Sequence, residues 1–238
     1  MTVHEIAPRL PGISALRDRC RSLAMLEAIA YDGFVGGDEY ADFEANWSRG
    51  CDLATLRSRD GVGVCYLVFS PAGALICGYD PRAPIAAYEG EAVFPPGLIE
   101  GVPTRILRFV ADAEFWHDEY GNGTVTVCLW REVTDDRWHH GAVDLPEGTH
   151  DADGANALLD LVVDPSPETY LRWTEERDGA ATEQAAREVY ALHPLTRQLV
   201  VKVNADASLT GLAPALTRIG YPHATDDLRP GLDHAEVT

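Results

Sequence analysis

The sequence predicts an α+β fold. An antiparallel meander sheet, formed by about residues 40–78 plus 124–143, is packed by an N-terminal helix and by C-terminal helices. Short β-rich runs separated by turn residues occupy the middle of the chain. Helical periodicity precedes them in residues 14–30 and returns after residue 154. Because strands and helices are segregated along the chain, an α+β fold is favoured over the alternating elements of an α/β fold.

The first predicted element is a helix over residues 14–30. Ser14 is a suitable N-cap, and apolar residues recur at helical spacing on one face. They are Leu16, Cys20, Leu23, Leu26 and Ala30. Glu27 falls away from this face, so we expect an amphipathic helix with Glu27 on its polar side. Residues 1–13 show little pattern and are assigned to an N-terminal extension.

The meander is the most distinct part of the predicted sheet. Asp60-Gly61 and Pro71-Ala72-Gly73 are strong turn signals between extended, apolar runs. The runs cover about residues 40–47, 53–58, 62–70 and 74–78. In the first of them, we expect Phe43, Ala45 and Trp47 on one face, because side chains alternate along a strand.

A proline-rich connection over residues 80–103 separates the meander from a second β-rich run at 124–131, whose hairpin partner is 138–143. Helical segments then begin at about residues 104, 154, 166 and 182. Residues 199–203 fit either a last strand or a buried helical turn. We predict a single domain over residues 14–222 and a flexible tail over 223–238, which is polar and has no pattern.

The charge of the chain limits its partners. There are 38 acidic and 19 basic residues, for a formal net charge of −19. A surface with this much negative charge repels phosphate backbones and anionic membranes. Neither a nucleic acid nor a membrane is therefore an expected partner. The sequence also lacks a secretory signal and any apolar stretch long enough to span a bilayer, which favours a cytoplasmic location. A partner protein with a basic surface is compatible with this charge.

The cysteines predict neither a metal site nor a redox motif. The five cysteines are an odd number, and no two have the close spacing of zinc-binding or redox pairs. They are Cys20, Cys51, Cys65, Cys77 and Cys128. We therefore expect free, buried thiols, with Cys51 the most exposed of them, and no cofactor.

Two histidine-containing segments are the candidate catalytic sites. The segment 135–140 ends in His139 and His140, and the segment 116–119 contains His117 and Asp118. Imidazole and carboxylate groups can bind a metal or transfer protons. Adjacent histidines on a strand point to opposite faces, however, so only one of His139 and His140 can join a given site. The alternatives are a polar hairpin turn and a solvated loop.

A D-x-D-G fragment at residues 151–154 has the first residues of a calcium loop. Ala155 and Val162 stand where that loop needs further oxygen ligands. The fragment is therefore interpreted as a turn that leads into a helix.

The long connection after the meander is a candidate binding surface. Tyr79, Arg82, Tyr88 and Phe94 lie along it or at its border. Aromatic and arginine side chains on long loops often supply binding energy at interfaces. The alternative is a loop that only covers the sheet.

The chain resembles a family of bacterial cytosolic proteins with no established activity. The likeness covers most of residues 14–222. It is carried by residues 22–29, Trp47, residues 70–74, residues 127–131 and residues 219–222. It implies a bacterial cytosolic protein with a single domain, and it transfers no functional residue. A fainter analogy, from size, acidity and the α+β outline, is to immunity-type proteins that neutralise a toxin by binding it.

Three functions remain open at this point. The first is a non-enzymatic protein that binds a protein partner, as an immunity-like or regulatory factor. The second is a metal-dependent or small-molecule hydrolase that uses the His- and Asp-rich region 117–153. The third is a structural or oligomeric protein without a ligand, although the sequence does not indicate an oligomeric state.

Overall fold

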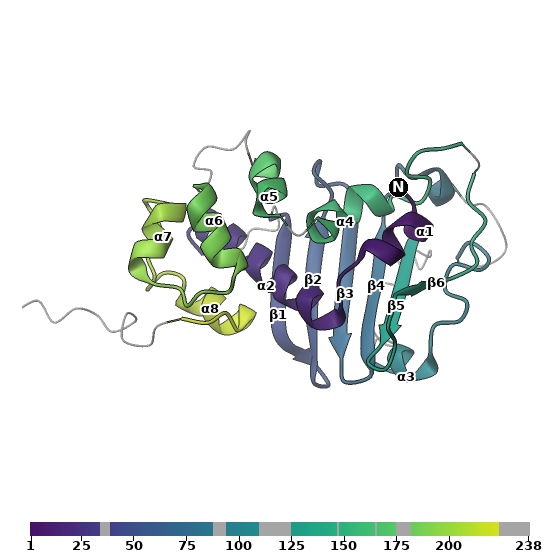
Figure 1. The fold of residues 1–238 in the computed structure, drawn as a ribbon, viewed down its shortest axis with the longest axis horizontal. Coiled ribbons are helices and arrows are strands. Elements are labelled where there is room, and N and C mark those ends of the chain that lie inside the picture. Colours follow the sequence, from purple (N-terminus) through teal and green to yellow (C-terminus); the bar gives the residue numbers. More distant parts are fainter. Residues whose placement is uncertain are drawn as a thin grey trace, which may run out of the picture.

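The computed structural model describes residues 1–33, 39–87, 94–109, 125–146, 148–164, 166–174 and 182–223. It confirms the predicted fold class. A six-stranded antiparallel sheet is packed by helix α2 near the N-terminus and by helices from the second half of the chain (Figure 1).

Each strand of the sheet pairs with its neighbours in sequence, in the order β1-β2-β3-β4-β5-β6. The strands are β1 Ala41–Ser48, β2 Cys51–Arg57, β3 Val64–Ser70, β4 Gly73–Tyr79, β5 Val127–Glu132 and β6 His139–His140. These bounds confirm the meander and its extension by a second hairpin. The last strand is much shorter than the predicted run 138–143.

A β-bulge interrupts the first strand. The register between β1 and β2 shifts between Glu44 and Ser48, and Asn46 has a positive φ of 57°. The Asp52 carboxylate accepts a hydrogen bond from the Asn46 backbone N–H at 2.9 Å, which holds the extra residue in place. The bulge ends the strict alternation that was predicted for this strand, so Phe43 is fully buried while Trp47 is half-buried.

Most of the helices lie before or after the sheet in the sequence, but one short α-helix and one 3-10 helix lie between β4 and β5. They are α1 Val3–Ile6, α2 Ile13–Ala30, α3 Thr104–Leu107, α4 Ala155–Val163, α5 Pro167–Thr174, α6 Glu183–Tyr190, α7 Arg197–Val203 and α8 Ala213–Ile219, with 3-10 helices η1 Ala7–Arg9 and η2 Pro84–Ala87. Residues 199–203 are thus helical. Helix α1 was not predicted; a capping box formed by Thr2 and Glu5 begins it, and Val3 and Ile6 are buried.

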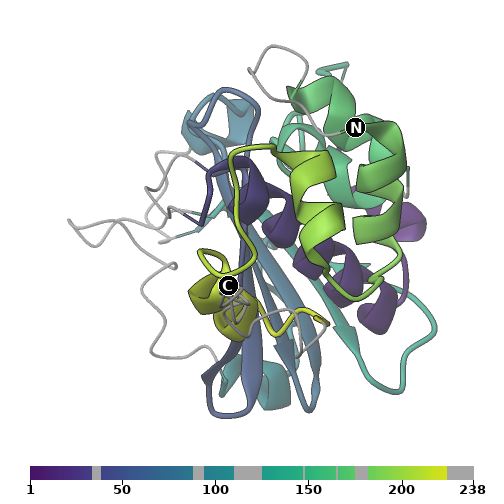
Figure 2. The same cartoon turned by 90° about the vertical axis from the view of Figure 1, so that its left-hand side faces the viewer.

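Different segments of the chain pack on the two faces of the sheet. Helices α2 and α4 pack on one face, and the strand alternation places Phe43, Leu67 and Ile76 beneath them. In Figure 2, which turns the molecule by 90°, these helices lie on one side of the sheet. The opposite face carries Trp130, which lies under Gly101 in the connection that precedes α3.

Both edges of the sheet are covered. Helix α8 lies beside β1, and a Cβ added at Gly220 would be 3.3 Å from the Ala45 side chain. At the other end, the backbones at Gly97 and Gly141 meet without intervening side chains. Covered edges cannot pair with the strands of other molecules, which protects a sheet from aggregation.

Helix α2 is buried more completely than an amphipathic surface helix. Its residues 22–29 are all buried, because the sheet lies on one side of α2 and helices α6, α7 and α8 lie around the rest. Glu27 is included, with no exposed surface, so the prediction that Glu27 lies on a polar side was wrong. Among the described residues, no helix combines the length and the apolar character needed to cross a membrane.

The close approach at Gly141 predicts a large loss of stability for Gly141→Ala. The new Cβ would overlap the Gly97 carbonyl oxygen and lie 2.6 Å from the Leu98 carbonyl oxygen, and backbone atoms cannot move aside cheaply. We expect the free energy of unfolding to fall by about 2–4 kcal/mol. Gly12→Ala is the control, because its Cβ would meet only an Arg131 side-chain atom at 3.9 Å. Denaturant titration should show a change of about 1 kcal/mol or less for the control. Equal losses in the two variants would contradict the prediction.

Candidate functional site

The histidines of the β5–β6 hairpin lie on opposite faces of the sheet. The His139 Nε2 atom is 3.2 Å from the Asp135 carboxylate, and its ring stacks on Trp130 with centroids 6.3 Å apart. Trp130 and His139 are directly opposed in the two strands. This arrangement is a half-buried surface pair on the face of the sheet that carries the α3 connection.

His140 belongs to a different environment. Its ring centroid is 4.5 Å from that of His4 in helix α1, and its Nδ1 atom is 2.9 Å from the Gly141 carbonyl oxygen. Partial burial and the nearby His140 lower the pKa of His4. His139 and His140 therefore do not share a site.

His117 and Asp118 lie outside the described residues, so they stay candidate site residues. Within the part of the chain that the structure describes, no three His, Cys, Asp or Glu side chains come together as potential metal ligands.

The described residues of the predicted binding loop differ in their local environments. Tyr79 is half-buried at the end of β4, and Arg82 forms an ion pair with Asp60 in the turn between β2 and β3. Phe94 is partly buried against the hydrophobic core. Tyr88 lies outside the described residues. Arg82 thus ties the loop to the meander, which is a structural role.

All five cysteines are free and buried, as predicted. The expectation that Cys51 is the most exposed was wrong, because its side chain begins β2 inside the core with no exposed surface. Burial raises the pKa of Cys20 to about 12 and also raises the pKa of Cys51, Cys65 and Cys77. High pKa values keep these thiols protonated and poorly nucleophilic.

The D-x-D-G fragment is a helix-leading turn, as interpreted from the sequence. The Asp151 carboxylate accepts hydrogen bonds from the backbone N–H groups of Asn156 and Ala157, at 2.7 and 3.0 Å. Asp153 accepts from Ala155 at 3.0 Å and from Val3, in helix α1, at 2.8 Å. The two carboxylates cap α4, and Asp153 also fixes α1 against it.

A buried polar network beside α2 was missed in the sequence. The Glu27 carboxylate accepts hydrogen bonds from the Tyr40 backbone N–H and the Tyr170 hydroxyl, both at 2.9 Å. The Tyr40 ring packs edge-on against Trp173 of α5, with centroids 5.2 Å apart. The sequence signal for this network was an acidic residue, Glu27, inside the apolar run 23–29. A carboxylate that is buried with such a run needs hydrogen-bond donors around it.

Asp160 of α4 extends this network. It accepts a hydrogen bond from the Trp173 indole N–H at 3.0 Å. Its other carboxylate oxygen is buried and has no hydrogen-bond partner among the described residues. Desolvation raises the pKa of Asp160 to about 6. Such a carboxyl could act in proton transfer, but a perturbed pKa alone does not define a site. Like Glu27, Asp160 interrupts an apolar run, here 158–163.

Comparisons with protein-family models, with curated proteins and with solved structures found no match. The resemblance described from the sequence therefore stays a prediction.

The buried cysteines predict slow reaction with thiol reagents. In the folded protein we expect the thiols to react about 100-fold more slowly than a free cysteine, or slower still, because burial limits access and suppresses the thiolate. Colorimetric titration with a disulfide reagent measures this, and all five thiols should react in guanidinium chloride. One thiol that reacts rapidly in the native protein would contradict the burial of that cysteine.

Asp160 predicts a specific pH dependence of stability. Its pKa is raised in the folded protein from the usual 3.8 to about 6. Its contribution is therefore favourable below about pH 4 and is lost as the pH rises through about 6. We expect the stability of Asp160→Asn relative to the unsubstituted protein to rise by about 2 kcal/mol between pH 4 and pH 7. Denaturant titrations at the two pH values measure the change.

Asp164→Asn provides a control of opposite sign. Hydrogen bonds from the Thr169 hydroxyl and the Ser166 backbone N–H lower the pKa of Asp164. Its contribution is therefore present at neutral pH and is lost in acid. Asp164→Asn should cost more stability at pH 7 than at about pH 2, because the contribution is lost below the usual carboxyl pKa of 3.8. Between pH 4 and pH 7 it should change little, and a rise in its relative stability as large as that of Asp160→Asn over that interval would rule out the assignment.

Proposed function

We propose that the protein is a non-enzymatic binding protein whose partner is a protein with a basic surface. The observation that carries the proposal is the surplus of carboxylates, which the cationic side chains cannot neutralise. With 38 acidic against 19 basic residues, the surface attracts cationic partners over distances set by the ionic strength.

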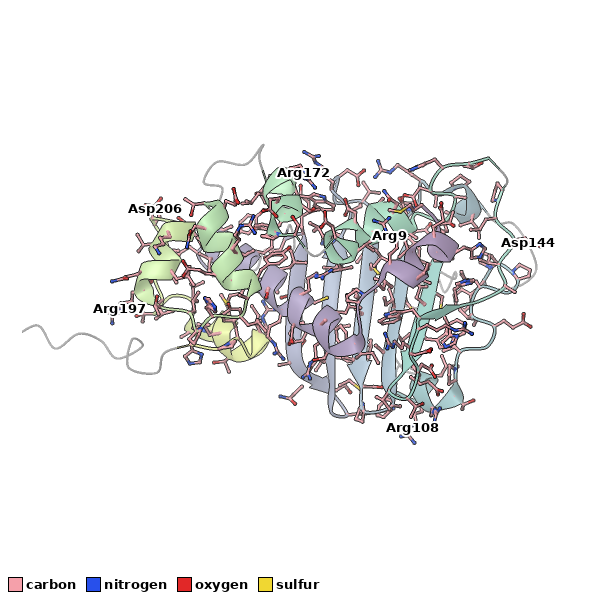
Figure 3. All side chains as sticks on the ribbon, in the orientation of Figure 1. Arg9, Arg108, Asp144, Arg172, Arg197 and Asp206 are labelled. Carbon is pink, nitrogen blue, oxygen red and sulfur yellow. The ribbon has the colours of Figure 1, made fainter. Side chains whose placement is uncertain are left out.

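Many of the cationic side chains are already held by carboxylates of the same chain. Those with a carboxylate within 4 Å include Arg17, Arg21, Arg82, Arg105, Arg172, Arg187, Arg218 and Lys202. Charged side chains such as Asp144, Arg172 and Asp206 lie at the periphery of the molecule (Figure 3). The field presented to a partner is therefore set by the acidic residues that are left over.

The surplus is unevenly distributed along the sequence. The described residues contain 23 acidic and 17 basic side chains, so most of the net charge of −19 is carried by the remaining segments. Residues 110–124 alone contain four acidic residues and no arginine or lysine. A partner with a compact basic patch would be attracted most strongly by such a concentration of like charge.

The described geometry gives less support to the hydrolase alternative. That function needs histidines of the region 117–153 to converge with carboxylates in one pocket. His139 is paired with Asp135, and the His140 ring lies against the His4 ring at a tilt. Among the described residues, the buried carboxylates of Glu27, Asp52 and Asp153 hold helices and strands together.

A salt-dependent capture experiment tests the proposal. Tagged protein would be isolated from lysate of its native host at low ionic strength, and retained proteins would be identified by mass spectrometry. We expect a partner with a basic surface that is released by about 0.5 M salt, where screening shortens electrostatic attraction to a few ångströms. Failure to retain any salt-sensitive basic protein would sink the proposal.

Two charge variants with the same net change sharpen the result. The first carries amides in place of the clustered acids Asp112, Glu114, Asp118 and Glu119. The second carries amides in place of the exposed, dispersed acids Glu100, Asp136, Asp144 and Asp206. Loss of the partner in the first variant and retention in the second would support the clustered charge as its attractant.

A further inference from the structure

A hollow of about 510 Å³ lies between helices α2, α5 and α6. It is lined by Arg19 on α2, Pro167 on α5 and Tyr190 on α6, with Leu192 just beyond α6. The three helices lie close together beside the sheet (Figure 1). Its size falls in the range of small-molecule sites, and apolar walls with a few polar groups are typical of them.

Arg19 differs from most of the partly buried cations of this protein. One of its Nη atoms donates to the Val162 carbonyl oxygen at the end of α4, but no carboxylate among the described residues lies within ion-pair distance of it. Partial burial lowers the pKa of Arg19. A guanidinium has five N–H donors, so Arg19 keeps donors available where it lines the hollow. Asp164 acts on the charge of Arg19 from beyond contact distance, so Arg19 has no direct anionic partner among the described residues.

Tyr190 supplies a second unsatisfied group. Its hydroxyl is buried and has no hydrogen-bond partner within the described part of the chain. Burial raises its pKa, so it stays protonated and able to donate. A buried hydroxyl without a partner is costly, and such groups in folded proteins call for an explanation. The hydroxyl has almost no accessible surface in the free protein, so an anion reaches it only when neighbouring side chains shift. A ligand that then accepts a hydrogen bond from Tyr190 would remove this cost.

The remaining charges of the wall are already paired. Asp18 lies 3.6 Å from Arg21, and Arg187, which is exposed at the rim, is held by Glu168 and Glu183. The hollow is therefore locally cationic at Arg19, although the whole molecule is acidic.

We propose that this hollow binds a small organic anion, in which one carboxylate or phosphate group is attached to an apolar body. Arg19 and the Tyr190 hydroxyl bind the anionic group, and Pro167 and Leu192 contact the apolar body. Arginine suits this task because its N–H groups match the oxygen spacing of carboxylates and phosphates. This site is independent of the partner proposed above, because it uses other residues and a ligand of opposite charge.

Isothermal titration calorimetry on the full chain tests the site with defined probes. Benzoate and phenyl phosphate represent the two anionic groups on an apolar body, benzamide is the neutral counterpart of benzoate, and inorganic phosphate lacks the body. We expect saturable binding of benzoate or phenyl phosphate at concentrations up to about 10 mM, and none of benzamide. Which of the two binds more tightly identifies the anionic group.

Two variants locate the binding. Tyr190→Phe removes only the unpaired hydroxyl, so it should melt at the same temperature as the unsubstituted protein or higher and bind the anion about tenfold more weakly. Arg19→Gln should weaken binding at least as much. Arg9→Gln, which removes an exposed arginine outside the hollow, should leave affinity unchanged.

Two results would overturn the proposal. One is the absence of saturable binding by both organic anions. The other is binding that is equal in Tyr190→Phe, Arg19→Gln and the unsubstituted protein, which would place the anion elsewhere. Because Tyr190→Phe removes no hydrogen bond to the described residues of the free protein, its result stands even if Arg19→Gln fails to fold.

Discussion

The complete burial of the second half of helix α2 is the constraint on which the rest of this structure depends. A helix with one apolar stripe can lie on a sheet and leave its other side in water. In α2, residues 22–29 are all buried, so one covering layer is not enough. The sheet covers one side, and helices α6, α7 and α8 must pack around the rest. The position of the C-terminal helices beside the sheet, and the hollow between α2, α5 and α6, follow from this requirement.

Buried carboxylates connect the parts that this packing brings together. Glu27 links α2 to Tyr40 and α5, Asp52 holds the β1 bulge, and Asp153 fixes α1 to α4. In each case the carboxylate accepts a backbone N–H from another segment, which offsets the cost of its burial. Asp160 is less completely satisfied, and its pKa is raised accordingly. Acidic residues in this protein therefore act both as internal connectors and as the source of its external field.

The parts of the fold that the sequence predicted correctly are those determined by neighbouring residues. Asp60-Gly61 and Pro71-Ala72-Gly73 are turn signals that the sequence shows locally. Each joins two strands that pair with each other in the structure. The missed features depend on residues far apart in the sequence. Glu27 is buried because Tyr170 lies 143 residues away in sequence yet beside it in space, and the four-residue α1 is held by Asp153, 150 residues away. Arg19 and Tyr190 line one hollow for the same reason, and no local pattern joins them.

The order of elements along the chain has a consequence for the folding of this protein during its synthesis on the ribosome. Helix α2 is synthesised before the sheet, and α6, α7 and α8 come after it. A nascent chain can assemble the meander hairpin by hairpin, yet it still exposes the apolar far side of α2 until those helices emerge. Transiently exposed apolar surface is prone to aggregate and is what chaperones hold. Translation of the last third of the chain is thus the interval in which the growing protein most needs protection.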